Sequence, residues 1–117
     1  MIKLFILKPG FTDPNNDSEG IHYFCPHSAL IEGLIKYYPQ LEEKMEINRI
    51  DFKRPRPEVI KLLGEENQSC PVLIIDNNQD TETDTGYFSK YGNKLFVNED
   101  DLILKYLADK FGIDAPH

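Results

Sequence analysis

Two cysteines, Cys25 and Cys70, carry the most distinctive chemistry of this 117-residue chain. Cys25 opens the segment Cys25-Pro26-His27-Ser28, directly before a stretch with helical periodicity. A helix N-terminus presents unpaired N–H groups and partial positive charge, which favour a thiolate over a thiol. We therefore expect Cys25 to be a nucleophile that attacks disulfides. The alternative is an inert cysteine that caps a core helix.

His27 and Ser28 are the residues best placed to assist Cys25. A protonated His27 would add positive charge two positions from the sulfur. The Ser28 hydroxyl can donate a hydrogen bond to a thiolate, but it cannot resolve a mixed disulfide. The predicted catalytic group at this segment is therefore Cys25, His27 and Ser28.

The composition excludes several classes of function. Lys and Arg number 13 against 20 Asp and Glu, which gives a net charge of −7. Nucleic acids and anionic membranes attract clustered Lys and Arg, so neither is an expected partner. No apolar run reaches the roughly 18 residues of a spanning helix, and residues 1–7 are too short for a signal peptide. Two cysteines are too few for a disulfide-rich secreted domain. We expect one cytoplasmic domain over residues 1–117, and the sequence leaves its oligomeric state open.

The elements expected to position these residues alternate between strands and helices. Four strands are predicted over residues 4–7, 45–52, 71–75 and 94–97. Three helices are predicted, one from Pro26 that is stopped by Pro39, one over 58–63, and one from an N-cap at Asp100 to Gly112. Loops cover 8–22 and 76–86, and the second is expected to face solvent. The order β-α-β-α-β-β-α predicts an α/β fold with a mixed four-stranded sheet flanked by helices, a parallel first crossover and antiparallel last strands.

This order resembles that of the thioredoxin fold, and three motifs carry the resemblance. The segment 25–28 looks like the C-x-x-C motif with its second cysteine replaced by serine, as in monothiol glutaredoxins. The segment 69–73 resembles the cis-proline strand of that superfamily. The segment 93–107 is similar to the last strand and helix of glutathione-transferase N-terminal domains, with Glu99 and Asp100 in place of their Glu-Ser. The resemblance implies a thioredoxin-like fold over nearly the whole chain.

Three further segments look like those of a small bacterial family of thioredoxin-like proteins of unknown function, namely 7–11, 23–27 and 64–69. The chain also ends about where a glutathione transferase would begin its helical second domain. The resemblance therefore implies a fold and argues against transfer to bulky electrophiles.

Cys70 has three open interpretations. In the fold that the chain resembles, the residue before the cis-proline faces the active-site cysteine, so Cys70 could resolve a mixed disulfide on Cys25. Such a disulfide requires Cα atoms within about 7 Å. Cys70 could instead be a small packing residue, or it could hold a metal with Cys25 and either His22 or His27. The spacing of these residues matches no recognised metal motif, and we expect no metal.

The resemblance also implies a set of residues for glutathione, the expected co-substrate. The main chain at Cys70 and Pro71 would pair with the tripeptide. The side chains expected to bind its ends are Glu99 and Asp100 at the γ-glutamyl group, and Lys8 or Arg56 at the glycine carboxylate. No resident cofactor is expected.

Plainer interpretations of the same charged residues remain open. Asp100 fits a simple helix cap. Arg54 and Arg56, which are flanked by prolines, fit a solvated turn. The sequence thus supports thiol–disulfide or glutathione-linked exchange at Cys25, with a small thiol or a disulfide-bearing protein as partner. The alternative is a non-catalytic thioredoxin-like binding module with a vestigial redox site.

Overall fold

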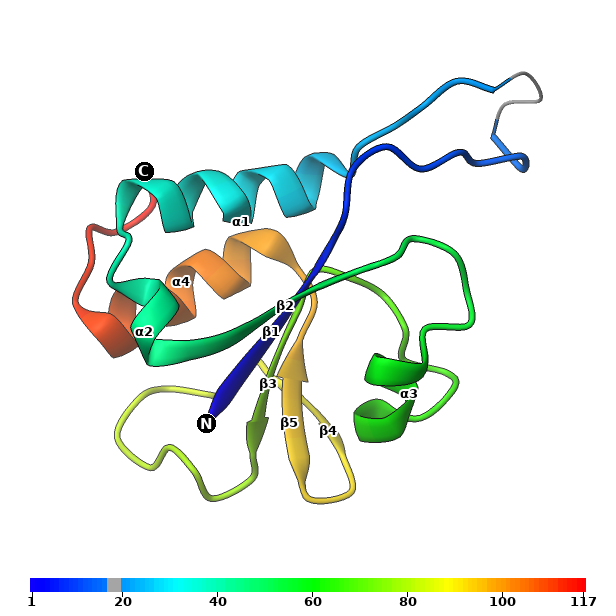
Figure 1. Cartoon of the computed structure of the whole chain (residues 1–117). Coiled ribbons are helices and arrows are strands. Elements are labelled where there is room, and N and C mark those ends of the chain that lie inside the picture. The colour runs from blue at the N-terminus through cyan, green and yellow to red at the C-terminus, as the bar shows by residue number, and fades with distance from the viewer. Residues whose placement is uncertain (17–19) are drawn as a thin grey trace.

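The computed structural model describes residues 1–16 and 20–117. Its elements in chain order are β1 (Ile2–Leu7), α1 (Pro26–Tyr37), α2 (Leu41–Lys44), β2 (Met45–Ile50), α3 (Pro57–Leu63), β3 (Val72–Asp76), β4 (Ser89–Tyr91), β5 (Lys94–Val97) and α4 (Asp100–Phe111). The fold is α/β, with a mixed five-stranded sheet flanked by helices (Figure 1). No helix in the described part of the chain is long and apolar enough to cross a membrane.

The sheet has the strand order β2-β1-β3-β5-β4. β1 and β2 are parallel, as a connection through α1 requires, and the other neighbours are antiparallel. The predicted parallel first crossover and the antiparallel pairing of β3 with β5 are therefore confirmed.

The predicted number of strands is wrong, because β4 adds a fifth strand at the edge of the sheet. The three residues of β4 are all exposed, so the strand has no buried face to reveal it by hydrophobic alternation. The available signal was the turn: Tyr91 pairs with Lys94 across the two-residue loop Gly92-Asn93. Gly92 has a φ of 57°, which suits a tight hairpin.

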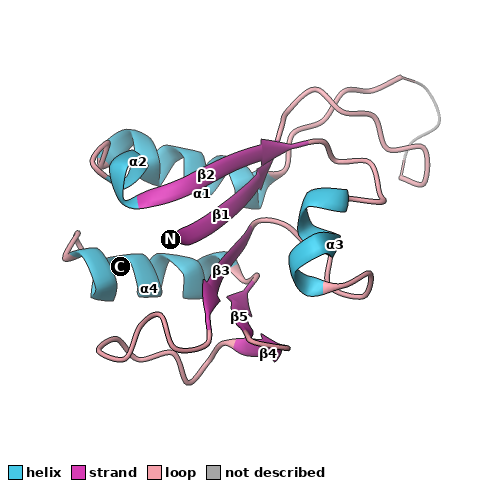
Figure 2. Ribbon diagram, turned by 60° about the horizontal axis from the view of Figure 1, so that its bottom comes forward, coloured by secondary structure: helices cyan, strands magenta, loops and turns pink. Residues whose placement is uncertain are grey.

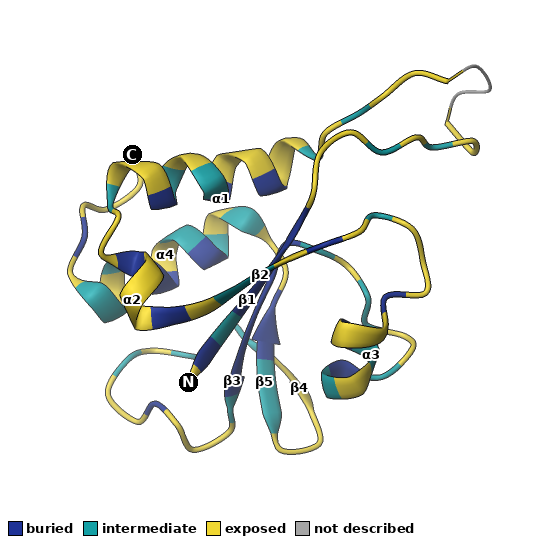
Figure 3. Cartoon of the chain, in the orientation of Figure 1, coloured by how far each residue is buried: buried dark blue, intermediate teal, exposed yellow. Residues whose placement is uncertain are grey.

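Each face of the sheet packs against a hydrophobic core, and alternate residues of β1 point to the two cores. In β1, Ile2, Leu4 and Ile6 join the core under α1 and α4, whereas Phe5 and Leu7 join the core under α3. Figure 3 shows this buried central region of the strands, with exposed residues on the outer surfaces of the helices. The continuous apolar run of β1 follows from burial on both sides.

The helices divide between the two faces. α1 and α4 contribute Ile31, Ile35, Ile103 and further buried residues to one core, and α3 contributes Val59 and Leu63 to the other. In Figure 2, α4 accordingly lies to the left of β3 and α3 lies to its right. The short α3 covers only part of its face.

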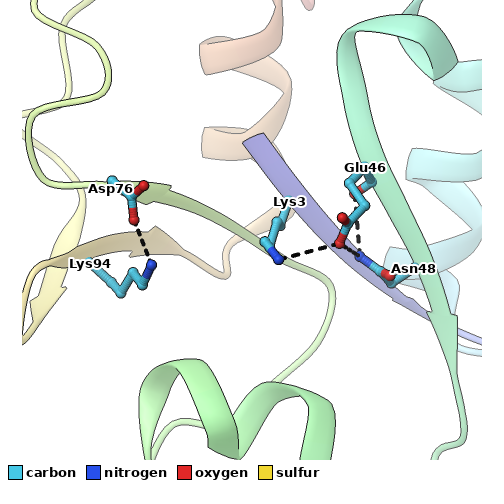
Figure 4. Close-up of polar contacts among 5 residues, drawn as sticks. All are labelled: Lys3, Glu46, Asn48, Asp76 and Lys94. Carbon is cyan, nitrogen blue, oxygen red and sulfur yellow. Dashed lines mark hydrogen bonds and ion pairs between the residues drawn. The ribbon is translucent and has the colours of Figure 1, made fainter. Parts of the chain in front are cut away.

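The uncovered part of the α3 face is polar. Lys3 lies 3.5 Å from its cross-strand partner Glu46, which also accepts a hydrogen bond from Asn48 at 3.1 Å (Figure 4). Lys94 donates to its own cross-strand partner Asp76 at 2.5 Å. Opposite charges directly across a sheet stabilise their register.

The loop after β3 departs from the prediction that it faces solvent. Asp80 is buried and accepts hydrogen bonds from the Tyr106 hydroxyl at 2.7 Å and from the amides of Glu82 and Thr83 at 3.1 and 3.0 Å. Lys110 lies 3.5 Å away. Burial alone would raise the pKa of Asp80, but these hydrogen bonds outweigh it and hold the pKa well below its usual range. Asp80 therefore fixes this loop over α4.

The predicted loop 8–22 includes residues 17–19, which lie outside the described residues. The described parts on either side run next to each other, because Phe11 and Tyr23 form an isolated antiparallel bridge. These two described parts project from the body of the protein beyond the start of α1 (Figure 1).

Candidate functional site

Cys25 is the N-cap residue of α1, with an extended backbone at φ −81° and ψ 117°. Its Sγ accepts a hydrogen bond from the backbone N–H of Ser28 at 3.5 Å. Pro26 follows as the first helical residue, where its missing N–H removes no helical bond. The thiol is free and only partly buried, so solvent can reach it. As the N-cap residue, it also lies at the end of the helix that carries partial positive charge.

Ser28 contacts the sulfur through its backbone rather than through its hydroxyl. The residue is buried, and its Oγ accepts the N–H of Leu7 at 3.1 Å. The predicted hydroxyl donation to Cys25 is therefore replaced by a bond to the end of β1. The reason is helical geometry. Ser28 is the third residue of α1, so its side chain faces the sheet while its backbone N–H points back toward Cys25 at the N-cap. Ser28 thus fixes the start of α1 against β1.

His27 is bound to Asp100, with 2.6 Å between Nδ1 and Oδ2. The His27 side chain is exposed, and the pair joins the first turns of α1 and α4. The hydrogen bond from His27 lowers the pKa of Asp100, against a smaller opposing effect of burial. Asp100 is the first residue of α4 rather than its N-cap as predicted, and the N-cap is Glu99.

Cys70 lies immediately before Pro71 and β3, and the Cys70–Pro71 peptide bond is cis. Its thiol is free and lies 3.8 Å from the carbonyl oxygen of Gln68. Burial raises the pKa of Cys70 to about 11, although the nearby guanidinium of Arg56 opposes the shift. At neutral pH Cys70 is therefore a protonated thiol.

Both cysteines line one cavity of about 340 Å³, which we call the cysteine pocket. Its other lining residues include Leu7, Phe11, Tyr23, Phe24, Phe52, Arg54 and Arg56. The walls are largely apolar and aromatic, and the charged residues among them are the two arginines and Asp13. A pocket of this kind can exclude water from a sulfur while offering a cation to an anionic ligand.

Arg56 is buried, with 4% of its surface exposed, so the plainer interpretation of it as a solvated turn residue is wrong. Its Nε and Nη2 donate to the carbonyl oxygen of Phe52 at 2.9 and 2.6 Å, and its Nη1 donates to that of Gln68 at 2.8 Å. The guanidinium also lies 5.4 Å from the centre of the Phe52 ring. Arg56 therefore ties the loop after β2 to the segment that carries Cys70.

Lys8 lies in a second cavity next to the cysteine pocket, where its Nζ is 3.6 Å from Asp51. This cavity, which we call the basic groove, has a volume of about 900 Å³ and is lined by residues 8–15, 51–54 and Arg56. The rings of Phe11 and Phe52 stack at 4.1 Å with an interplanar angle of 2°. Sequence reasoning gave neither ring a role, although Phe52 begins the basic run that ends at Arg56.

The structure brings together only part of the predicted set. Cys25, Cys70 and Arg56 line the cysteine pocket, and Lys8 lines the adjoining groove. Glu99 and Asp100 lie at the start of α4 beside His27, and neither lines these two cavities. The residues implied for the two ends of glutathione therefore do not form a single pocket.

The alternative of a metal held by Cys25, Cys70 and a histidine finds no support in the described residues. Within 1–16 and 20–117, no group of three His, Cys, Asp or Glu side chains could hold a metal ion. The ring of His22 instead bonds the carbonyl oxygen of Gly10 at 3.0 Å, and that of His27 bonds Asp100.

Together, the fold and the pocket define an α/β protein with two free thiols at one end of a mixed five-stranded sheet. The chain belongs to the family described as "Protein of unknown function (DUF3088)", whose model matches residues 2–115. The prediction of a small family of unknown function is confirmed at that level. No curated protein and no solved structure matches the chain.

Proposed function

We propose that this protein is a thioredoxin-like thiol oxidoreductase with Cys25 as its nucleophile. The observation that carries the proposal is the position of the Cys25 sulfur at the N-cap of α1, where it accepts the Ser28 amide inside a pocket shared with Cys70. An N–H donor and the helix dipole both stabilise a thiolate over a thiol. Thiolates are the reacting species in disulfide exchange.

Two features of the fold support the thioredoxin-like part of the proposal. The parallel pair β1–β2 is joined to the antiparallel pair β3–β5 in the order β2-β1-β3-β5, with β4 added at the edge. The cis peptide bond at Cys70–Pro71 lies at the position where the sequence resembles the cis-proline strand.

The proposed reaction starts with attack of the Cys25 thiolate on a disulfide R–S–S–R′. The Cys25–S–S–R bond forms, the S–S bond of the substrate breaks, and R′–S⁻ leaves and takes a proton from solvent. A second thiolate, R″–S⁻, then attacks the Cys25 sulfur of the mixed disulfide, so that R–S⁻ leaves and a Cys25–S–S–R″ bond forms. A third thiolate of the same kind attacks the R″ sulfur, which breaks that bond, regenerates the Cys25 thiolate and releases R″–S–S–R″. Two electrons pass to the substrate, and they come from the attacking thiols.

The second thiolate comes from an external low-molecular-weight thiol, for which glutathione is the expected co-substrate. Cys70 is an unsuitable resolving group at neutral pH, because burial raises its pKa to about 11 and keeps it protonated. In this scheme Cys70 packs beside Pro71 and faces Arg56. Lys8, in the adjoining groove, is available for a carboxylate of the thiol.

The test is the reduction of bis(2-hydroxyethyl) disulfide by glutathione, followed by enzymatic recycling of oxidised glutathione. We expect Cys25→Ala to reduce the rate to the uncatalysed background, because the nucleophile is lost. The matched control is Cys70→Ser, which should retain most of the activity. A Cys25→Ala protein that is as active as the wild type would rule out the proposal.

The alternative is a non-catalytic binding module, and one observation favours it. Ser28, which stands where a second motif cysteine would be, is buried and bonded to β1, so the segment holds one thiol and a structural serine. Alkylation separates the two functions. A Cys25 that reacts rapidly at pH 6 indicates a nucleophile, whereas one that reacts only at alkaline pH indicates a binding module.

A further inference from the structure

The basic groove concentrates positive charge on an acidic protein. The cations that line it are Lys8, Lys53, Arg54 and Arg56, which are four of the 13 Lys and Arg residues in the chain. Only two of the 20 acidic residues line it, Asp13 and Asp51. The groove therefore has the opposite sign to the chain as a whole, whose net charge is −7. A local field of this kind attracts anionic ligands that the rest of the surface repels.

Two of the exposed cations of the groove, Lys53 and Arg54, have no carboxylate partner among the described residues, and the third, Lys8, has an exposed one. Lys8 lies 3.6 Å from Asp51, and both side chains are largely exposed. Among residues 1–16 and 20–117, neither Lys53 nor Arg54 takes part in an ion pair. Both are exposed. Their charges are therefore available to a ligand.

The groove continues into the cysteine pocket. Phe11, Phe52 and Arg56 line both cavities, and the two stacked rings form a shared wall. The guanidinium of Arg56 lies 5.4 Å from the centre of the Phe52 ring and is buried beside Cys70. A ligand in the groove would thus cross an apolar surface between the exposed cations and the two sulfurs.

The size of this path exceeds that of a small thiol. Pockets for small molecules hold roughly 300–1,000 Å³. The cysteine pocket, at about 340 Å³, has the volume of one such site, and the basic groove adds a cavity of about 900 Å³. A short thiol would fill the first cavity and leave the second empty, whereas an extended chain would occupy both.

We propose that the basic groove binds an extended acidic peptide segment of a partner protein and so presents a disulfide of that segment to Cys25. Carboxylates of the segment pair with Lys53, Arg54 and Lys8, and an apolar side chain lies on Phe11 and Phe52. This inference rests on the proposed function and specifies its substrate class. Charge complementarity here serves selection and encounter rate more than affinity.

The first arm of the test measures binding without chemistry, in Cys25→Ser protein. The probes are two fluorescent hexapeptides built around one phenylalanine, one rich in Asp and Glu and one rich in Lys. We expect the acidic peptide to bind, the basic peptide not to bind, and the affinity to fall as salt is raised. Equal binding of the two peptides would overturn the proposal.

A matched pair of double variants locates the binding site. Lys53→Gln with Arg54→Gln should raise the Kd of the acidic peptide about tenfold, since each exposed ion pair contributes up to about fivefold. The control, Lys36→Gln with Lys90→Gln, removes the same charge from exposed positions in α1 and β4 and should leave the Kd unchanged. A similar loss in both proteins would show a general charge effect and would contradict a specific groove.

The second arm compares two substrates of the wild-type protein: oxidised glutathione, and the mixed disulfide of glutathione with a form of the acidic hexapeptide in which one residue is replaced by cysteine. A KM that is lower for the hexapeptide disulfide than for oxidised glutathione would support binding of an extended segment. This difference in KM should disappear in the variant with Lys53→Gln and Arg54→Gln. Equal KM values would show that the groove takes only a short anionic thiol, which overturns the proposal. If no disulfide is reduced but the acidic peptide still binds Cys25→Ser protein, the proposed function fails while the peptide groove stands.

Discussion

The two ends of the sheet each hold a buried charge supplied by a loop, and the two ends use it differently. Arg56, in the loop after β2, donates to the carbonyl oxygens of Phe52 and Gln68. Asp80, in the loop after β3, accepts from Tyr106 and from two amides of its own loop. Asp80 lines neither cavity, whereas Arg56 lines both and faces Cys70.

By this difference, Asp80 has a structural role only, whereas Arg56 can also interact with Cys70 and with a ligand in the two cavities. Both charges fix a loop, because a buried ion must be hydrogen-bonded. Only Arg56 also has N–H groups beyond those bonded to the two carbonyls, since a guanidinium carries five. The following predictions test whether the Asp80 end is purely structural and the Arg56 end is both structural and chemical.

The largest expected effect on stability is that of Asp80→Ala. It leaves the Tyr106 hydroxyl buried without its acceptor and removes the partner of Lys110. We expect a loss of about 3 kcal/mol in the free energy of unfolding, as for breaking a buried polar cluster. Urea denaturation measures it. Turnover at Cys25 in the folded fraction should not change, and a selective loss of turnover would contradict the comparison.

The acid limb of stability should also depend on Asp80. Its pKa is lower in the folded protein than in the unfolded chain, because the hydrogen bonds from Tyr106, Thr83 and Glu82 outweigh burial. The stabilisation is therefore complete above the unfolded value, about 3.9 for aspartate, and is lost as the pH falls below it. Asp80→Asn should flatten the decline of unfolding free energy below about pH 4. An unchanged acid limb would show that other carboxylates dominate.

Arg56→Met should combine a smaller structural effect with a chemical one. It leaves the carbonyl oxygens of Phe52 and Gln68 without their charged donor, so we expect a loss of about 2 kcal/mol in unfolding free energy. It also removes the cation that opposes the rise in the pKa of Cys70, so this pKa should move above about 11. Alkylation of Cys70 against pH measures the shift. Arg56→Lys is the control, because it retains the charge, and a Cys70 that titrates identically in all three proteins would contradict the contact.

The smallest expected effect is that of Asp100→Asn at the pair with His27. The His27 side chain is two-thirds exposed, so the pair should contribute about 0.5 kcal/mol or less to stability. Because the hydrogen bond from His27 lowers the pKa of Asp100, this small contribution is present above the ordinary aspartate value and is lost as the pH falls. Thermal unfolding at pH 7 and pH 3 checks it. A large loss at pH 7 would show that the pair holds α1 against α4.

The sequence predicted the elements with periodic apolar residues and missed those without them. The continuous apolar runs predicted β1 and β3, and the spacing of apolar residues predicted α4. α4 ends at Gly112 as expected, and this glycine has the left-handed conformation. β4 and α2 are short and mostly exposed, so neither has an apolar periodicity that would reveal it, although β4 pairs with β5 across a two-residue turn.

The sequence grouped Cys25, Cys70 and Arg56 in one candidate site, and these residues line one pocket, but the sequence did not predict that Arg56 is buried. The position of Cys25 follows from local capping signals, which a short segment contains. The burial of Arg56 and Asp80 depends on carbonyl and hydroxyl partners 12 and 26 residues away, so composition alone suggested solvated turns. The aromatic stack of Phe11 on Phe52 is likewise a tertiary contact between two loops.

The most direct test of the central claim is the rate of alkylation at each cysteine, measured from pH 5 to pH 11 by mass spectrometry of the folded protein. The same protein unfolded in urea gives the reference rate for each thiol. We predict that Cys25 reacts faster than its unfolded reference at pH 6, and that Cys70 stays unreactive until the pH approaches about 11. A Cys25 that reacts no faster than in the unfolded chain would contradict its assignment as the nucleophile.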